Sequence, residues 1–176
     1  EIVVNHAHLG EQIESALGDG QQYGVDIRYS PESDALETAG GIANALSILD
    51  DAPFIVAAGD IYCDFDFTAL LSHDLGAALA HLVLVPNPLH NPDGDFALVQ
   101  SALKNEGSQR HTFSGIGLYR PELFSGIAPG ESRPLAPLLR AAADRGRASG
   151  ELHTGTWFDI GTPERLAALN RALWQG

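Results

Sequence analysis

Short apolar runs alternate along this chain with segments whose apolar residues recur at helical spacing. The runs that resemble strands cover residues 1–5, 25–29, 54–58 and 81–85, and helical spacing follows the first three of them. Alternation of this kind is typical of an α/β protein in which helices cover a sheet of parallel strands. We therefore predict a doubly wound, mostly parallel (Rossmann-like) sheet, with ligands bound beyond the carboxyl ends of its strands.

The second half of the chain departs from this alternation. Two candidate strands, residues 96–99 and 112–119, are joined by a polar stretch, which predicts a small antiparallel insertion. Strands are also expected at 149–153 and 157–160, and Thr162-Pro163 then supplies a capping hydroxyl and a first-turn proline for a terminal helix. With 176 residues and no linker, the whole chain is expected to form a single domain.

The charge balance excludes several classes of partner. Ten basic against twenty-three acidic side chains give a formal net charge of −13, which repels a phosphate backbone, so we expect no nucleic-acid binding. No apolar stretch approaches the roughly 18 residues that a membrane span requires, so no membrane partner is expected. The single cysteine, Cys63, permits no intramolecular disulfide and fits a reducing, cytoplasmic compartment. Nothing in the pattern indicates an oligomeric state.

Two carboxylates follow predicted strands in apolar surroundings. Gly59-Asp60 closes the run 54–58, and Asp159 lies within the segment Trp157-Phe158-Asp159-Ile160-Gly161-Thr162. An aspartate at a strand end is also common as a turn residue, but an unpaired carboxylate in an apolar setting is costly and needs a partner. Mg²⁺ typically binds one or two carboxylates and completes its shell with water and substrate phosphates. We therefore predict that Asp60 and Asp159 form a Mg²⁺ site.

Two consecutive glycines stand at the predicted entrance of a helix. In Glu37-Thr38-Ala39-Gly40-Gly41 they would expose backbone N–H groups and leave room for a flat base or a ribose. Close packing of the chain would explain them equally well. Glu37 would accept a hydrogen bond from a ribose hydroxyl or a base N–H, although a role at the helix start accounts for it as well.

A second acidic motif, Asp64-Phe65-Asp66, matches the D-x-D pattern with which metal-dependent glycosyltransferases hold a sugar nucleotide. Three residues match such a pattern often by chance, and Asp66 is also placed to cap a helix that carries Phe67 and Leu70. The seven histidines show no metal-ligand spacing, and we expect them in loops or at the surface.

Taken together, the motifs around Asp60, Gly40-Gly41 and Asp159 resemble those of the sugar-1-phosphate nucleotidyltransferase family. Further likeness lies in Val3-Val4-Asn5-His6, Ile27-Arg28-Tyr29-Ser30-Pro31-Glu32, Gly94-Asp95-Phe96 and Thr112-Phe113-Ser114-Gly115-Ile116. The resemblance implies transfer of a uridylyl group from a nucleoside triphosphate, UTP, to a sugar 1-phosphate, with N-acetylmuramic acid 1-phosphate as the expected acceptor. Pyrophosphate would be the second product.

The resemblance also implies roles for individual residues. Asp60 and Asp159 match the catalytic positions that bind the metal ion, here Mg²⁺. The positions that match the nucleotide side of the site are Glu37, Gly40, Gly41 and Gly59. The positions that match contacts to the sugar are Gly94, Asp95, Ser114 and Gly115.

One family hallmark is missing from the chain. The glycine-rich G-x-G-x-R-x-x-P loop and the P-K pair that follows it do not occur in the sequence. We therefore expect this chain to lack an N-terminal phosphate-binding portion of the domain and to be a poor catalyst by itself. Two alternatives stay open, namely a metal-dependent glycosyltransferase that uses Asp64 and Asp66, and a non-catalytic module that binds sugar nucleotides.

Overall fold

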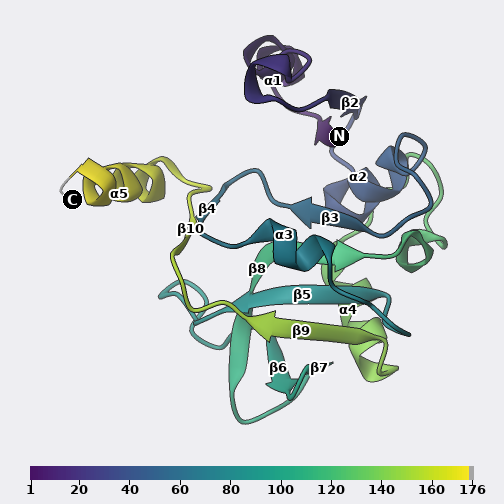
Figure 1. The fold of residues 1–176 in the computed structure, drawn as a ribbon, viewed down its shortest axis with the longest axis vertical. Coiled ribbons are helices and arrows are strands. Elements are labelled where there is room, and N and C mark those ends of the chain that lie inside the picture. The colour runs from purple at the N-terminus through teal and green to yellow at the C-terminus, as the bar shows by residue number, and fades with distance from the viewer. Residues whose placement is uncertain (175–176) are drawn as a thin grey trace. The chain divides into compact units, whose positions relative to one another are not determined.

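A computed structural model describes residues 1–174 of the protein (Figure 1). The chain divides into two compact units. Unit 1 comprises Glu1–Ala52 with Arg120–Leu139, and unit 2 comprises Pro53–Tyr119 with the chain from Arg140 onward. The expectation of one domain over the whole chain stays a prediction, and the two units are described separately below.

Unit 1 contains two short parallel strands and the helices that follow them. Strand β1 pairs in parallel with β2, in register from Ile2 opposite Ile27 to His6 opposite Pro31. The elements of this unit are β1 (Ile2–His6), α1 (Gly10–Leu17), the 3₁₀ turn η1 (Gln21–Tyr23), β2 (Ile27–Pro31), α2 (Glu37–Ala45) and the 3₁₀ turn η2 (Pro121–Phe124). Helix α4 (Leu135–Asp144) contains the boundary to unit 2.

Unit 2 is built on a six-stranded sheet with the strand order β3-β8-β5-β9-β7-β6. A separate two-stranded antiparallel sheet pairs β4 with β10. The elements of this unit are β3 (Phe54–Ala57), β4 (Ile61–Cys63), α3 (Phe67–Leu71), β5 (Ala80–Val85), β6 (Phe96–Val99), β7 (Ala102–Lys104), β8 (Arg110–Tyr119), β9 (Ala148–Leu152), β10 (Trp157–Asp159) and α5 (Pro163–Trp174).

The mixed α/β architecture is as predicted, but the expectation of mostly parallel pairing is wrong for the described sheet. In the six-stranded sheet β5 pairs in parallel with β9, whereas the other described pairings are antiparallel. The reason is β8, which runs for ten residues and pairs with β3, β5 and β6. The predicted antiparallel insertion is therefore not separate from the main sheet, because β8 lies between β3 and β5. Strand β3, expected to be buried on both faces, is an edge strand with half-buried side chains.

Part of the core of unit 2 lies between the sheet and α3. All six residues of β5 are buried, and Val83 packs with four other buried apolar side chains, namely Leu70, Leu75, Ile116 and Leu118. Burial of a side chain of this size contributes about 1.5–3 kcal/mol relative to its exposure. The predicted cap of α3 is present, since the Asp66 carboxylate accepts a hydrogen bond from the Thr68 N–H at 2.9 Å. Among residues 1–174, no helix is both long and apolar enough to cross a membrane.

Candidate active site

The two-stranded sheet of β4 and β10 brings the two predicted metal-binding aspartates together. Asp159 pairs with Ile61 in this sheet, and the Ile160 N–H donates to the Asp60 carbonyl oxygen at 2.8 Å. The side chains converge on Gly161: a Cβ placed there would lie 2.6 Å from Asp60 Oδ2 and 3.2 Å from Asp159 Oδ1. Both carboxylates therefore border the same small space, although their residues are far apart in the sequence.

The two carboxylates differ in their partners. Asp159 Oδ1 accepts a hydrogen bond from the Gly161 N–H at 2.9 Å, and Oδ2 lies 2.5 Å from Nη1 of Arg165 and 3.4 Å from Nε2 of His90. Asp60 is exposed and forms no side-chain hydrogen bond or ion pair with the described residues. Burial without a partner was the reason to expect a cation at Asp159; that reason fails, because Asp159 is half-buried and paired with Arg165.

A pocket in unit 2 is open beside this carboxylate pair. Asp60 and Asp159 line it, together with His90, Asp95 and residues 112–115 of β8. The pocket joins the predicted metal-binding residues to three of the four residues predicted on the sugar side, Asp95, Ser114 and Gly115. A cavity lined by carboxylates and by polar groups such as His90 and Thr112 suits a polar ligand.

Asp95 is held by hydrogen bonds that leave it facing this pocket. Its Oδ2 accepts from the Asn91 side-chain amide at 3.1 Å and from the Phe113 N–H at 2.8 Å. The neighbouring Gly94 has a φ of +63°, and a Cβ there would lie 2.7 Å from Oδ1 of Asn87. Gly94 therefore shapes the turn that presents Asp95, and it does not line the pocket itself.

Ser114 and Gly115 form part of the pocket wall through the backbone of β8. The Ser114 side chain is buried and its hydroxyl accepts a hydrogen bond from the Ile116 N–H at 3.1 Å. The Ser114 carbonyl accepts one from the Trp157 indole N–H at 3.0 Å, which ties β8 to the strand that carries Asp159. Gly115 has a φ of +83°, and a Cβ there would meet Cδ1 of Ile61 at 2.7 Å, so a larger residue does not fit.

Two carboxylates are the oxygen donors that hard divalent cations such as Mg²⁺ and Mn²⁺ prefer. The described residues contain no group of three or more His, Cys, Asp and Glu side chains that could hold a metal ion. Mg²⁺ does not need such a group, because one or two carboxylates hold it while water and substrate phosphates supply the remaining oxygens. The exposed Asp60 and the adjacent Asp159 offer these two carboxylates.

In unit 1 the glycine pair lies inside α2 rather than at its entrance. Gly40 and Gly41 are the fourth and fifth residues of the helix, and both are buried. The Gly40 N–H donates to the Arg133 carbonyl at 3.1 Å, so this amide is not free for a ligand. A Cβ on Gly41 would lie 2.5 Å from Oε1 of Glu32, so the close approach of this side chain accounts for the glycine without a ligand. Their nucleotide-binding role stays a prediction.

Glu37 and Gly59 are both open to a ligand. Glu37 is exposed at the first position of α2 and has a φ of +56°, which is uncommon for a residue with a side chain. A Cβ on Gly59 would meet no atom within 4 Å, so Gly59 borders open space beside Asp60. Neither residue is committed to packing.

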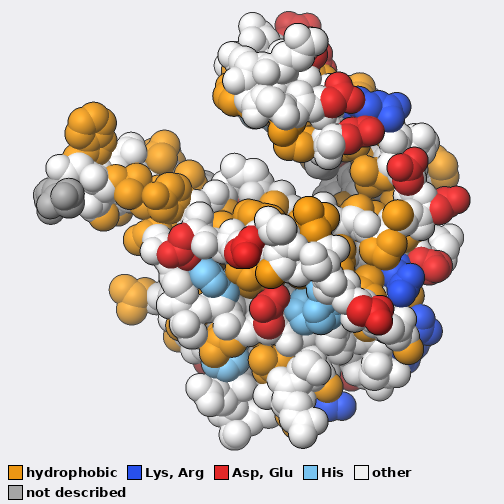
Figure 2. Space-filling view, viewed as in Figure 1, with side chains coloured by type: hydrophobic (Ala, Val, Ile, Leu, Met, Phe, Trp, Pro, Cys, Tyr) orange, Lys and Arg blue, Asp and Glu red, His pale blue; other side chains and the backbone are white. Residues whose placement is uncertain are grey.

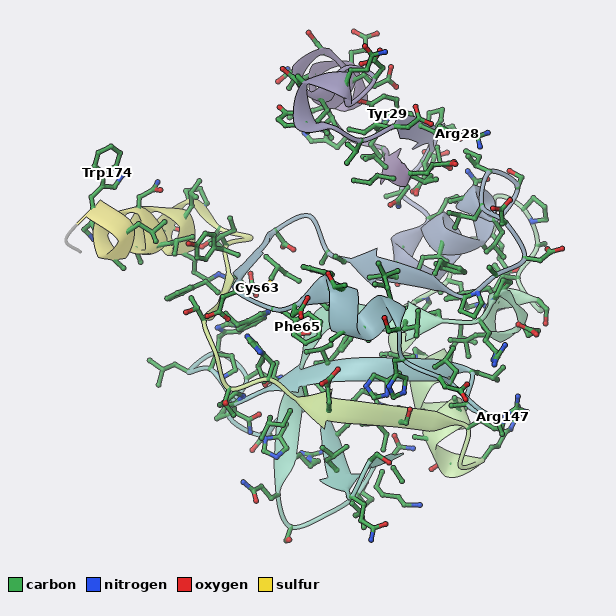
Figure 3. The ribbon with its side chains drawn as sticks, in the orientation of Figure 1. Arg28, Tyr29, Cys63, Phe65, Arg147 and Trp174 are labelled. Carbon is green, nitrogen blue, oxygen red and sulfur yellow. The ribbon has the colours of Figure 1, made fainter. Side chains whose placement is uncertain are left out.

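The two carboxylates of the D-x-D motif accept hydrogen bonds from the protein's own backbone. Asp64 Oδ1 accepts a hydrogen bond from the Thr156 N–H at 2.8 Å and lies 2.9 Å from Nε2 of His153. Asp66 caps α3. Phe65 between them, labelled beside α3 in Figure 3, packs its ring edge-on against that of Phe67, with the ring centroids 5.6 Å apart. These contacts favour the capping interpretation over the glycosyltransferase alternative.

Sequence reasoning missed three residues of the site. His90 was expected in a loop without a role, but it lines the pocket and faces Asp159. The predicted start of α5 at Thr162-Pro163 offered a signal for Arg165, since it places this arginine in the first turn beside Asp159. The contact of Trp157 with β8 had no sequence signal, because the two strands are distant in the chain.

A family model and two curated relatives all relate this chain to nucleotidyltransferases. The family model described as "Nucleotidyl transferase" matches residues 1–101. The N-acetylmuramate alpha-1-phosphate uridylyltransferase of Neisseria meningitidis serogroup B is 54% identical over 175 residues, which cover 94% of this chain and 75% of that protein. The UTP–glucose-1-phosphate uridylyltransferase of Synechocystis is 30% identical, with 98% of this chain and 51% of that protein covered.

The fold has solved counterparts. A Bacillus anthracis protein assigned as a glucose-1-phosphate thymidylyltransferase, crystallised with sucrose, superposes with a TM-score of 0.79 at 20% identity. The match covers 98% of this chain and 75% of that structure. At this level of identity the likeness shows the fold alone. The chain spans about three quarters of the meningococcal relative and about half of the Synechocystis relative.

Proposed function

The chain belongs to the nucleotidyl transferase family, and from this premise we propose that it transfers a uridylyl group from UTP to a sugar 1-phosphate. The proposed acceptor is N-acetylmuramic acid 1-phosphate, and the products are the UDP-sugar and pyrophosphate. The 54% identity with the meningococcal uridylyltransferase supports this pair of substrates. A role in peptidoglycan recycling and a cytoplasmic place of action, where UTP is found, follow from the same proposal.

The observation that carries the proposal is the convergence of Asp60 and Asp159 on one point beside Gly161. These residues would hold Mg²⁺, which neutralises phosphate charge and so favours attack of one phosphate on another. The protein carries a formal net charge of −13, and Figure 2 shows acidic side chains spread over the visible face. Two phosphorylated substrates are repelled by such a surface, so the need for a cation at the site is strong.

The residues of the pocket would bind and orient the sugar phosphate. The Asp95 carboxylate, fixed by Asn91 and the Phe113 N–H, is placed to accept hydrogen bonds from sugar hydroxyl or amide groups. Ser114 and Gly115 would contribute the backbone wall against which the sugar ring packs, and Gly94 the turn that presents Asp95. Holding the acceptor in one orientation is a large part of the acceleration that such an enzyme can supply.

We assign the nucleotide side to the first part of α2. Glu37 would accept hydrogen bonds from the ribose or the base, while the small residues Gly40 and Gly41 keep α2 close to its neighbours. Gly59 would let the nucleotide approach the backbone next to Asp60. As part of the same proposal, the fold that binds the nucleotide is Rossmann-like.

The test is an assay of pyrophosphate release from UTP and N-acetylmuramic acid 1-phosphate with MgCl₂. Asp60→Asn and Asp159→Asn should each lower the rate by about 100-fold or more, because each removes one charged metal ligand. Asp51→Asn, an exposed loop residue with the same chemical change, is the matched control and should keep the full rate. Unchanged rates in both site variants would refute the metal role.

A further inference from the structure

Asp64, the first carboxylate of the D-x-D motif, holds the segment that leads into β10. Its Oδ1 accepts a hydrogen bond from the Thr156 N–H at 2.8 Å and lies 2.9 Å from Nε2 of His153. The Asp64 N–H donates in turn to the Thr156 carbonyl at 3.1 Å. The side chain and the backbone of Asp64 therefore both bind residues 153–156, the segment between β9 and β10.

Residues 153–156 carry the chain from the six-stranded sheet to the two-stranded sheet. At their start the His153 N–H donates to the Leu84 carbonyl at 2.8 Å, one residue beyond the pairing of β9 with β5. A Cβ on Gly155 would collide with Oδ1 of Asp64 and would lie 2.6 Å from Cε1 of His153. A larger residue at position 155 and the Asp64 carboxylate therefore exclude each other.

The register of β10 on β4 decides which face of the pair Asp159 occupies. Each strand has three residues, and Asp159 lies opposite Ile61. In this register Phe158 is 41% exposed, whereas Asp159 lines the pocket. A slip of one residue would turn every side chain of β10 to the other face, and two strands by themselves are marginally stable at best. Contacts beyond the three residue pairs must therefore enforce the register.

Such contacts exist at both ends of the pair. At the end that carries Asp159, the Ile160 N–H donates one backbone hydrogen bond to the Asp60 carbonyl. At the other end Asp64 binds Thr156 twice, once through its N–H and once through its carboxylate. A slipped β10 would lose both of these bonds, because another residue would then lie opposite Asp64. The Asp64 carboxylate thus favours the one register that points Asp159 at the pocket.

We propose that Asp64 is a positioning residue for Asp159: by holding residues 153–156 it sets the register of β10 on β4, so that the Asp159 carboxylate faces Asp60. The inference rests on the proposed function, in which these two aspartates hold Mg²⁺. Asp64 does not line the pocket and is no ligand of the ion. Its loss should therefore weaken metal binding although both metal-binding carboxylates are still present.

The test compares Asp64→Ala with Asp66→Ala, which makes the same change two residues away and also removes the acceptor of a backbone N–H. Both variants should lose a similar amount of stability in urea, because each loses a hydrogen bond of the same kind. Mn²⁺ binding without nucleotide, followed by electron paramagnetic resonance, should weaken about tenfold in Asp64→Ala. It should stay within twofold of the wild type in Asp66→Ala. Asp64→Asn, which keeps an acceptor oxygen for the Thr156 N–H, should recover most of the affinity.

The fluorescence of Trp157 reports the position of β10 without any metal. Its side chain is half-buried, and its indole N–H donates to the Ser114 carbonyl of β8 at 3.0 Å. The other tryptophan of the chain, Trp174, is 88% exposed and is replaced by phenylalanine in all the proteins compared. The Trp157 emission should shift to longer wavelength in Asp64→Ala but not in Asp66→Ala, because a displaced β10 exposes the indole to water.

Gly155→Ala tests the same contact from its other side. The added methyl group should displace the Asp64 carboxylate and weaken Mn²⁺ binding by a similar factor. The double variant of Gly155→Ala and Asp64→Ala should bind Mn²⁺ no worse than the poorer single variant, since both changes act on one contact. Losses that add in the double variant would overturn the inference.

Three further outcomes would also overturn it: wild-type Mn²⁺ affinity in Asp64→Ala, an unchanged Trp157 emission in that variant, or equal losses in Asp64→Ala and Asp66→Ala. If the wild type binds Mn²⁺ but releases no pyrophosphate from UTP and the sugar phosphate, the proposed function fails. Asp64 is then still judged on Mn²⁺ affinity and Trp157 emission, neither of which needs turnover. A wild type that binds no Mn²⁺ refutes the metal role of Asp60 and Asp159 and this inference with it.

Discussion

Two pairs of aspartates lie near the short strand β4, and they differ in what their carboxylates contact. Asp64 and Asp66, which follow the strand, give their carboxylates to the N–H groups of Thr156 and Thr68. Asp60, which precedes it, is exposed and faces a pocket together with Asp159. The D-x-D pair has the more familiar motif, but one oxygen of each of its carboxylates binds the protein's own backbone, and neither residue lines the pocket. A position at the pocket, rather than the motif, distinguishes the candidate ligand site from a turn.

The largest effect that sharpens this contrast is expected from Gly161→Ala. The added methyl group would lie 2.6 Å from Oδ2 of Asp60 and 3.2 Å from Oδ1 of Asp159, so the carboxylates must move apart. We expect the Mg²⁺ concentration for half-maximal rate to rise about tenfold, a cost near 1.4 kcal/mol. Gly126→Ala, where a Cβ meets no atom within 4 Å, is the control. A normal Mg²⁺ dependence in Gly161→Ala would contradict the shared site.

A smaller effect, and one on stability alone, is expected from Asp66→Ala. Loss of the N-cap of α3 should lower the free energy of unfolding by about 1 kcal/mol, because the Thr68 N–H loses its acceptor. Urea unfolding measures this change, and Asp66→Asn, which keeps a capping oxygen, should restore most of it. The transfer rate of the folded variant should be that of the wild type. A rate lowered as strongly as in Asp60→Asn would show that the D-x-D motif is part of the active site.

The smallest effect concerns the pH dependence of stability. The Thr156 N–H bond holds the pKa of Asp64 below its usual range. A carboxylate whose pKa is depressed by folding stabilises the protein above the ordinary value of about 4, and that contribution is lost as the pH falls through the folded value. Melting temperatures of wild type and Asp64→Asn should therefore differ at pH 6 and converge below about pH 4. A difference that is constant with pH would show that the charge is not involved.

Local signals predicted well what local interactions determine. The apolar run 81–85, the Asp66 cap and the start of α5 after Thr162 all rest on neighbours a few residues apart, and all three are present. The pairing of β4 with β10 is different, because it joins three-residue strands nearly a hundred positions apart. No pattern in so short a strand specifies its partner. The antiparallel direction of β8 was predicted, but its place between β3 and β5 was not, because these partners are distant in the chain.

The candidate site was predictable in part. The sequence motifs led to Asp60 and Asp159, and the structure brings their carboxylates to one point. It does so while Asp159 is already paired with Arg165, a partner that depends on the path of the chain between β10 and α5. Gly40 illustrates the opposite case: a glycine pair suggested open backbone amides, but its N–H is bonded to the Arg133 carbonyl from a distant segment.

The most direct test measures Mn²⁺ binding, as a spectroscopic substitute for Mg²⁺, by electron paramagnetic resonance of the protein with UTP present. If Asp60 and Asp159 share one ion, the protein binds one Mn²⁺, each Asp→Asn variant loses most of that affinity, and the double variant loses little more than either single one. Retention of wild-type Mn²⁺ affinity in Asp60→Asn and in Asp159→Asn would contradict the shared site.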